Sequence, residues 1–493
     1  MLHCEAWPRD GPCWACSRMG GSSRNEVHGR SPLMRRTQRP LSFRPPHHIT
    51  RKRVAASVVA VALLSSLSAL AGSPQESALD TVARAHSSAT RSAQSEAALS
   101  GLPGGEATGA LAAAAVVRPV DVSSFKIDWS RLGLDLDRAQ VVDGAYVQTL
   151  STGAKVTYTV DPKLQRHIKG VLKRGAVPHG GAAVVEPSTG RVLALVSRSV
   201  DAPRMDDVAL NPVAPSASVF KIVTAAALME TAGVSPTERV CYHGGRSRLT
   251  EINIKGSKRL DNRCGTLSDA VAWSINSLIA KLAYHRLSQE QLEQWAYKFG
   301  YGSPIPFELD LASSKVERVD NKVERARMAA GFWHTYLSPL HGALMSAAVL
   351  NDGVMMVPTI VEKLESKDGE VIYTRQKRTL RRVMKASTAT KLKAMMQRTA
   401  TVGTARKYFK HRREFPKTVT AGGKTGTLSR KKPSYLGYTW FVGFGEDTKY
   451  EGVEVAVASL ACNTPTWRIK GPFISSEAIR KYIELERERR KSS

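Results

Sequence analysis

The sequence lacks the marks of a nucleic-acid-binding module. It contains no paired cysteine and histidine spacing of the zinc-finger kind, no basic region followed by heptads, and no aromatic RNA-binding segment. No internal repeat is evident. We therefore expect no nucleic-acid partner, and we expect neither a metal nor a cofactor.

Acidic residues are also scarce. The 493 residues include 72 Lys and Arg but only 43 Asp and Glu, so the formal net charge is +29. Such an excess favours an anionic partner, such as a membrane surface or a polyanionic wall. The basic segment 406–417 lies just before a strand-like stretch, and it is interpreted either as a solvated loop or as a contact for acidic wall peptides.

Long hydrophobic runs are rare, and one of them stands out. Residues 54–71 are 18 uncharged, mostly small or apolar residues directly after the basic triplet 51–53. A membrane-spanning helix needs about 20 such residues, and a basic flank stays in the cytoplasm. The triplet 69–71 also resembles a signal-peptidase site. We expect a single-pass inner-membrane anchor, or else a signal segment, that places the remaining chain outside the cytoplasm.

Cysteine is limited to six residues, and three of them lie within residues 1–53. The other three, Cys241, Cys264 and Cys462, would be exported. A disulfide between Cys241 and Cys264 is compatible with that compartment and would contribute roughly 3 kcal/mol for a loop of this size. The alternative is three buried free thiols.

Changes in composition divide the chain into five parts. Met34 offers an alternative start, which would leave residues 1–33 untranslated. The segment after the apolar run is rich in Ala, Ser and Gly, as expected of a linker. The predicted parts are a basic cytoplasmic leader (1–53), the anchor or signal segment (54–72), a low-complexity linker (73–121), a connector (122–160) and one large folded domain (161–493).

The pattern of the folded domain predicts strands at both of its ends and helices between them. Strands are expected at 182–197, around a Pro-Ser-Thr-Gly turn, and at 422–427, 437–445 and 453–461. Helices are expected at 215–233, 267–287, 338–353 and 471–490. This order predicts an α+β fold with a central antiparallel sheet flanked by helices and a helical insertion.

A lysine inside an apolar helix is the first sign of chemistry. Lys221 lies one helical turn after Ser218, on the same helix face. Burial without a partner lowers the pKa of an ammonium group, and a lysine with a lowered pKa can take the proton of a serine hydroxyl. The alternative without catalytic function is a serine that caps the helix and a lysine whose side chain reaches solvent.

Two further motifs follow in the order that this chemistry needs. Ser274-Ile275-Asn276 lies in the next predicted helix, and Lys424-Thr425-Gly426 lies in a predicted strand. The set Ser-x-x-Lys, Ser-x-Asn and Lys-Thr-Gly resembles the penicillin-binding protein transpeptidase family.

The resemblance runs from about Asp143 to Tyr482. It includes the stretches SASVFK, SINSLIAKLA, GGKTGT and WFVGF, and a connector similar to that of class A members. There is no room between anchor and domain for a glycosyltransferase module. The resemblance implies the serine β-lactamase/D,D-peptidase fold, with a helical subdomain that carries the Ser-x-Asn motif.

The resemblance also implies roles for single residues. Ser218 is the expected nucleophile on a D-Ala-D-Ala amide, and Lys221 is the expected general base. Ser274 is expected to relay a proton to the leaving amine, and Asn276 to bind the substrate backbone.

The strand motif completes the implied site. Lys424 would supply positive charge, and the hydroxyls of Thr425 and Thr427 would bind the substrate carboxylate. The backbone N–H groups of Ser218 and Thr427 would form an oxyanion hole. Gly426 would leave room for the substrate backbone along the strand.

These residues favour a membrane-anchored peptidoglycan D,D-transpeptidase that cross-links stem peptides, releases D-Ala and binds penicillin covalently. Its expected partners are stem peptides, β-lactams, the membrane and a separate glycosyltransferase. The alternatives are a D,D-carboxypeptidase, a β-lactamase, and a non-catalytic β-lactam sensor or scaffold. A β-lactamase is disfavoured because no convincing glutamate for deacylation is visible in the sequence.

Overall fold

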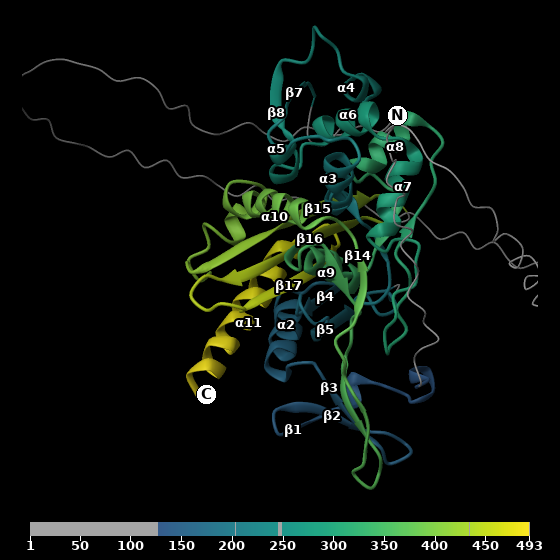
Figure 1. The fold of residues 1–493 in the computed structure, drawn as a ribbon, viewed down its shortest axis with the longest axis vertical. Helices are drawn as coiled ribbons and strands as arrows, with labels where there is room; N and C mark the ends of the chain where they lie inside the picture. The colour runs from purple at the N-terminus through teal and green to yellow at the C-terminus, as the bar shows by residue number, and fades with distance from the viewer. Residues whose placement is uncertain (1–126, 203, 245–248, 433, 493) are drawn as a thin grey trace, which may run out of the picture. The chain divides into compact units, whose positions relative to one another are not determined.

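The structure, a computed structural model, describes residues 127–202, 204–244, 249–432 and 434–492 (Figure 1). The predicted leader, anchor and linker therefore lie outside the described residues. In the described part of the chain, no helix combines the length and the apolar character needed to cross a membrane.

A five-stranded antiparallel sheet forms the centre of the domain. Its order joins strands from the two ends of the folded domain, as the sequence predicted. In spatial order the strands are β15 (Val419–Arg430), β16 (Leu436–Asp447), β17 (Glu454–Asn463), β4 (His179–Val185) and β5 (Val192–Ser199).

Helices cover both faces of this sheet (Figure 1). Alternate residues of β16 enter two different cores, because successive side chains of a strand point to opposite faces. Trp440, Val442 and Phe444 pack in the cluster that includes α9 (Pro339–Leu350). Phe441 packs in the other cluster, with α2 (Pro162–Arg174) and α11 (Gly471–Ser492).

Local capping sets where several helices begin. Ser338 accepts a hydrogen bond from the backbone of His341 at the start of α9, with Pro339 in the first turn. Thr266 and Asp269 form a capping box at the start of α5 (Leu267–Ala272). These polar residues satisfy N–H groups that the first turn of a helix leaves without partners.

The predicted helix over 215–233 begins with a tighter turn. The 3₁₀ helix η4 (Ala217–Phe220) leads directly into α3 (Lys221–Glu230), whose residues Lys221 to Leu228 are all buried. Gly233 lies just beyond the helix with a positive φ of 64°.

The prediction of one helix over 267–287 was wrong. The structure divides this stretch into α5 and α6 (Asn276–Arg286), separated by a turn at Trp273–Ile275. Ser274 in this turn has a φ of 55°, which a continuous helix does not allow. The apolar spacing of both halves resembles one helix, so the break is not visible in the periodicity.

The remaining elements complete the helical subdomain and a second sheet. The second sheet pairs strands of the predicted connector with a later hairpin, in the order β1-β2-β3-β12-β13. Its strands are β1 (Gln140–Val142), β2 (Ala145–Thr149), β3 (Lys155–Tyr158), β12 (Val361–Glu365) and β13 (Val371–Thr374). The other helices are α4 (Glu251–Lys255), α7 (Gln289–Lys298), α8 (Lys322–Ala329), α10 (Ala386–Thr401), η2 (Trp129–Arg131), η3 (Leu136–Arg138) and η5 (Arg406–Tyr408). Short strands are β6 (Ala214–Pro215), β7 (Arg239–Tyr242), β8 (Arg263–Thr266), β9 (Lys315–Val316), β10 (Thr335–Leu337), β11 (Val354–Met356) and β14 (Thr379–Arg382).

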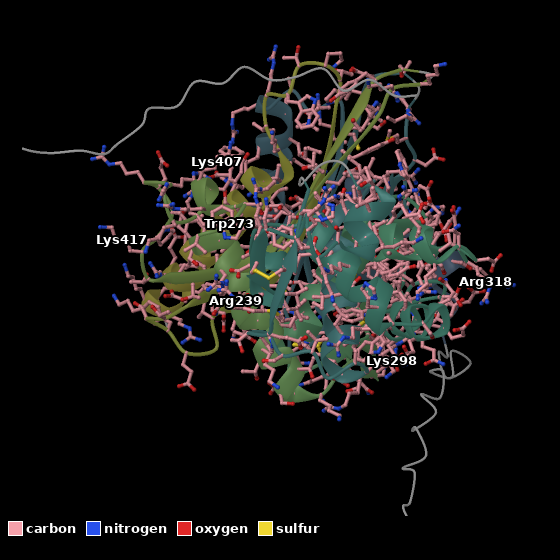
Figure 2. The ribbon with its side chains drawn as sticks, turned by 90° about the horizontal axis from the view of Figure 1, so that it is seen from above. Arg239, Trp273, Lys298, Arg318, Lys407 and Lys417 are labelled. Atoms are coloured by element: carbon pink, nitrogen blue, oxygen red, sulfur yellow. A yellow bond between two sulfur atoms is a disulfide. The ribbon has the colours of Figure 1, made fainter. Side chains whose placement is uncertain are left out.

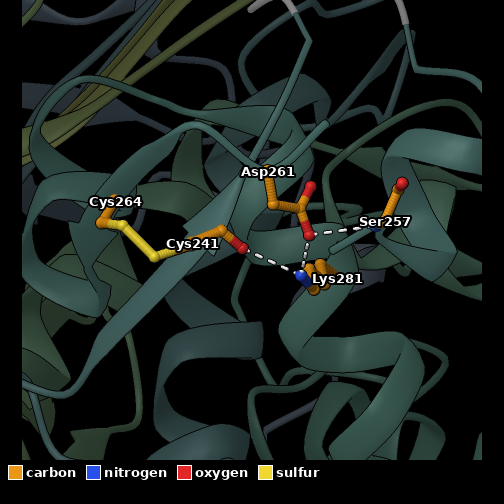
Figure 3. Close-up of a disulfide and its surroundings, with 5 residues drawn as sticks. All are labelled: Cys241, Ser257, Asp261, Cys264 and Lys281. Carbon is orange, nitrogen blue, oxygen red and sulfur yellow. Dashed lines mark hydrogen bonds and ion pairs between the residues drawn. A yellow bond between two sulfur atoms is a disulfide. The ribbon is translucent and has the colours of Figure 1, made fainter. Parts of the chain in front are cut away.

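A disulfide links the two strands of the β7–β8 hairpin to each other (Figure 3). Cys241 and Cys264 lie directly opposite each other in the strand register. The carbonyl of Cys241 accepts a hydrogen bond from Lys281 Nζ at 2.9 Å, and Lys281 also pairs with Asp261. Since Lys281 lies on α6, the hairpin is attached to the helix that begins with Asn276. Cys462 is a buried free thiol.

We expect the Cys241→Ser, Cys264→Ser double variant to unfold more easily. The loop that the disulfide closes spans 23 positions of sequence, so its removal should lower the free energy of unfolding by about 3 kcal/mol. Urea denaturation with and without reductant measures this. Reductant should weaken the unmutated protein to a similar degree and leave the variant unchanged; a variant as stable as the oxidised protein would contradict the expectation.

Candidate active site

Ser218 lies in the tight turn η4, which the sheet and a second loop hold from two sides. Ala217, just before it, has a φ of 49°, a left-handed conformation that costs energy for any residue with a Cβ. Trp440 Nε1 donates a hydrogen bond to the carbonyl of Pro215 at 2.9 Å. The backbone of Ser216 donates to Thr335 O at 2.8 Å. The serine-bearing turn is therefore fixed before any ligand arrives.

Lys221 Nζ lies at the meeting point of three chain segments. It is 2.7 Å from Ser218 Oγ, 2.6 Å from Asn276 Oδ1 and 2.5 Å from the carbonyl oxygen of Ala330. The whole lysine side chain is buried.

The chemistry of these partners assigns the hydrogens. A carbonyl oxygen can only accept, so the two N–H groups of a neutral amine satisfy Asn276 Oδ1 and Ala330 O. In the neutral amine the nitrogen lone pair then faces the hydroxyl of Ser218, whereas an ammonium would donate to that hydroxyl as well. In this arrangement the Ser218 O–H donates to Lys221 Nζ, as a general base requires.

Electrostatics favour the neutral amine. Burial lowers the pKa of Lys221 well below its ordinary value, and the nearby positive charge of Lys424 lowers it further. No carboxylate is within ion-pair distance of Lys221 in the described part of the chain. The free amine is therefore the form that this environment stabilises.

The turn between α5 and α6 supplies the second serine. Trp273, labelled in Figure 2, marks this turn, and Ser274 follows it with its left-handed backbone. The Oγ of Ser274 accepts a hydrogen bond from Lys424 Nζ at 2.9 Å. Asn276, two residues later, opens α6 and contacts Lys221. The break in the helix lets neighbouring residues face the two lysines.

Strand β15 forms an edge of the central sheet, and it carries the lysine motif. Lys424 is buried, and its Nζ donates to Ser274 Oγ and to the carbonyl of Thr425 at 2.8 Å. Burial lowers the pKa of Lys424 to about 7. Near neutral pH this amine is therefore divided between its charged and neutral forms.

The alternation of β15 separates its side chains into two sets. Lys424 and Gly426 lie on the face toward the serine turn, and Thr425 and Thr427 lie on the other face. Thr427 is exposed. Thr425 Oγ1 lies 2.6 Å from Thr404 Oγ1, which the loop after α10 supplies.

Gly426 has a packing role that the sequence did not suggest. A Cβ at this position would lie 3.1 Å from Trp440 Cβ, 3.2 Å from Ala217 Cβ and 3.3 Å from Ser216 O. A side chain would therefore push the serine turn away from the strand. The predicted room for a substrate backbone stays a prediction, and the close approach of η4 gives a second reason for glycine.

Three residues of this site escaped sequence reasoning. Ala330 contributes only its carbonyl oxygen, and any residue type has one. Gly331 lies against the serine turn, since a Cβ there would be 2.1 Å from Ala217 O and 2.8 Å from Ser218 N. Thr404, in a Gly-Thr-Ala stretch, meets Thr425. The positive φ of Gly331, 88°, reflects a conformation that only glycine adopts easily.

Within the described residues, no cluster of His, Cys, Asp or Glu is placed to hold a metal ion. The polar atoms of the site are serine hydroxyls, lysine amines, an amide and threonine hydroxyls. This set can activate a serine and stabilise charge.

Lys424 gives stability a pH dependence that a variant can isolate. Between pH 7 and 10.5 the unfolded chain binds a proton that the folded Lys424 has lost, so stability rises with pH. The burial penalty is fully present below pH 7 and vanishes above 10.5. We expect the stability of Lys424→Met relative to the unmutated protein to fall by roughly 1.4 kcal/mol per pH unit across this range.

Urea denaturation at pH 7, 8 and 9 measures that slope. Lys431→Met is the matched control. Because Lys431 is exposed, its removal should change the free energy of unfolding by an amount that does not vary with pH. A difference for Lys424→Met that does not change with pH would show that its folded pKa is ordinary.

Comparison with known proteins places this arrangement in a family. Residues 180–465 match the family described as Penicillin binding protein transpeptidase domain. The Peptidoglycan D,D-transpeptidase PbpA of Mycobacterium tuberculosis is 28% identical over 349 residues, which cover 63% of this chain and 68% of that protein.

Two solved structures share the fold. The D,D-transpeptidase domain of a peptidoglycan glycosyltransferase from Eggerthella lenta has a TM-score of 0.57 and 22% identity, covering 69% of this chain and 85% of that one. The penicillin G acyl-enzyme complex of penicillin-binding protein A from M. tuberculosis has a TM-score of 0.54 and 24% identity, covering 67% and 80%. Because the family match spans more than half of the chain, the protein belongs to the penicillin-binding protein transpeptidase family.

Proposed function

We propose that this protein is a peptidoglycan D,D-transpeptidase that works through an acyl-enzyme on Ser218. One observation carries the proposal: the buried amine of Lys221 lies 2.7 Å from Ser218 Oγ and donates to two carbonyl oxygens, so that in its neutral form its lone pair can accept the Ser218 proton. The name of the 28% identical M. tuberculosis relative supports the same reaction class.

Acylation begins at Ser218 Oγ. As Oγ forms a bond to the carbonyl carbon of the penultimate D-Ala, its proton moves to Lys221 Nζ. The carbonyl oxygen gains negative charge, which the backbone N–H groups of Ser218 and Thr427 stabilise. Such a donor commonly lowers the barrier by about 3 kcal/mol.

Collapse of the tetrahedral intermediate breaks the C–N bond. The leaving D-Ala nitrogen takes a proton from Ser274 Oγ, and Ser274 is resupplied by Lys424, its hydrogen-bond donor at 2.9 Å. The hydroxyls of Thr425 and Thr427 would meet the carboxylate of the leaving residue around the open edge of β15, because their side chains alternate to the face away from the serine turn. Charged Lys424 adds electrostatic attraction, and free D-Ala departs.

The second half transfers the acyl group. An acceptor amine from another stem peptide attacks the ester carbon and passes a proton to Ser274 and Lys424, which lost one in the first half. As the ester C–O bond breaks, the proton that Lys221 took during acylation returns to Ser218 Oγ, and the cross-link is formed. Penicillin enters the first half only: its β-lactam C–N bond breaks, and the leaving nitrogen stays attached to the acyl group. The acceptor therefore cannot reach the ester easily, and the label persists.

The proposal includes the setting of the enzyme. The apolar residues 54–71 after a basic triplet support an anchor that leaves the catalytic domain outside the cytoplasm, where peptidoglycan lies. A transpeptidase acts on glycan strands that a glycosyltransferase has polymerised, so a separate glycosyltransferase is the expected partner.

Covalent labelling tests the nucleophile and the base. The full-length protein, purified in detergent, is incubated with fluorescent penicillin beside Ser218→Ala and Lys221→Ala. We expect label on the unmutated protein, none on Ser218→Ala, and a rate at least a hundredfold lower on Lys221→Ala. An unlabelled unmutated protein would end the proposal, and label on Ser218→Ala would move the nucleophile elsewhere.

Product analysis then separates cross-linking from trimming. A pentapeptide donor and an amine acceptor are supplied together, and the products are resolved by mass. A cross-linked product with one D-Ala released per bond supports the transpeptidase. Free D-Ala with only the shortened peptide would identify a carboxypeptidase instead.

Gly331 allows a sharper test of the serine turn. In Gly331→Ala the new Cβ would collide with backbone atoms of Ala217 and Ser218, so the nucleophile must move. We expect acylation by penicillin to slow about a hundredfold, since small misplacements of reacting atoms have effects of this size.

The control for this variant is Gly369→Ala. Gly369 has nearly the same backbone conformation, with a φ of 86°, but nothing lies within 4 Å of its Cβ position. A general loss of folding caused by an alanine with a positive φ would lower labelling of both variants, whereas displacement of the serine turn slows only Gly331→Ala.

A further inference from the structure

The basic residues of the folded domain do not gather at a single place on its surface. The labelled cations Arg239, Lys298, Arg318, Lys407 and Lys417 lie at separate positions around the molecule (Figure 2). Several such residues have partners: Arg318 pairs with Glu293 at 3.1 Å, and Lys298 lies over the ring of Trp295. Arg325 and Arg430 are exceptions among the described residues, because each is partly buried, keeps a buried Nε without a hydrogen-bond partner and has no ion pair.

Arg430 is such a cation. It is the last residue of β15, its side chain is only partly exposed, and its Nε is buried without a hydrogen-bond partner. No carboxylate pairs with its guanidinium among the described residues. A buried guanidinium N–H without a partner costs free energy, so an acceptor on a bound ligand that reached this group would bind favourably.

The position of Arg430 connects it to the active site. It follows Lys424 and Gly426 at even spacing along β15, so it lies on the same face of the strand, toward the serine turn. In the register Arg430 lies opposite Leu436, two residues along β16 from Tyr438, and its charge opposes the rise that burial causes in the pKa of Tyr438. Tyr438 lies opposite Leu428 in the register.

The chemistry of the proposed reaction sets the direction of a bound donor peptide. The leaving D-Ala lies at the Ser274 and Lys424 end, because Ser274 protonates its nitrogen. The reacting carbonyl lies between Ser218 and Thr427. The retained part of the donor must therefore extend the other way, from Thr427 toward Arg430.

The free edge of β15 supports the same path. Strand β15 pairs only with β16 in the central sheet, and a peptide can add to its open edge as an antiparallel strand. Arg430 is three residues beyond Thr427, or about 10 Å along a strand. A long guanidinium side chain at that point reaches the residues just upstream of the D-Ala pair.

We infer that Arg430 is a specificity-determining residue that pairs with a free carboxylate on the retained part of the donor stem peptide. This inference rests on the proposed function, because the direction of the donor depends on the roles of Ser218 and Ser274. The carboxylate belongs to one of the two residues that precede D-Ala-D-Ala. A bidentate pair with a carboxylate matches the planar geometry of a guanidinium and satisfies its buried Nε.

The test compares synthetic pentapeptides that end in D-Ala-D-Ala. Each carries either a free carboxylate or its carboxamide at the residue just before the dipeptide, or at the residue one further upstream. D-Ala release by the full-length protein gives kcat/KM for every donor. We expect the acid form at one of the two positions to be preferred at least tenfold over the amide, and the arm that responds identifies the source.

Variants connect the preference to Arg430. Arg430→Gln should lower kcat/KM for the acid donor to the level of the amide donor, and Arg430→Lys should retain part of the preference because it keeps the charge but not the fork. Lys431→Gln is the matched control: it removes the same charge from the neighbouring exposed residue and should leave the ratio unchanged. If Arg430→Gln and Lys431→Gln lost the preference for the acid donor equally, the preference would come from general electrostatic attraction and not from a specific pair with Arg430.

Failure of this inference is distinct from failure of the proposed function. Penicillin labelling of the unmutated protein needs no stem peptide, so it reports on the proposed reaction alone. If labelling and D-Ala release occur but acid and amide donors react at equal rates, Arg430 does not recognise a carboxylate of the donor. A preference that survives in Arg430→Gln would overturn the inference as well.

Discussion

The rest of the site depends on shielding the amine of Lys221 from water. An amine in water at neutral pH is charged and has no lone pair to offer, whereas the buried environment of Lys221 stabilises its neutral form. The two oxygens that take its N–H groups come from different parts of the chain, Asn276 and Ala330. The catalytic geometry therefore requires the fold to bring α3, α6 and the end of α8 together around a single atom.

The chain segments that meet around the Lys221 amine contain strained or sterically restricted backbone. Ala217 and Ser274 both have positive φ values, and Gly331 leaves no space for a Cβ beside the serine turn. Non-glycine residues in left-handed conformations each cost about 1–3 kcal/mol and persist where the surrounding packing compels them. Here that packing includes the Trp440 hydrogen bond to Pro215 and the close contact of Gly426 with Ala217. The sheet thus stabilises a turn that would not adopt this shape alone.

Sequence reasoning reached the side chains of this site more readily than its backbone. Ser218, Lys221, Ser274 and Lys424 were predicted as one group because their chemistry depends on residue type, and the structure joins them through two lysine amines. The sheet order followed from strands at both ends of the domain. In contrast, the carbonyl of Ala330 and the space beside Gly331 depend on where the chain passes, and no residue type encodes them. The break at Ser274 was missed because apolar spacing continues through it.

The two lysines of the site also differ in what their burial allows. Burial lowers the pKa of Lys221 well below its ordinary value, and the charge of Lys424 lowers it further. Lys424 has a pKa of about 7 and can stay charged while Lys221 is neutral. One strand face carries both Lys424 and Arg430, with Gly426 between them against the serine turn. Because strand alternation places these residues on one face, the edge of β15 has a fixed electrostatic order, and a peptide bound along it in one direction places opposite charges beside both cations.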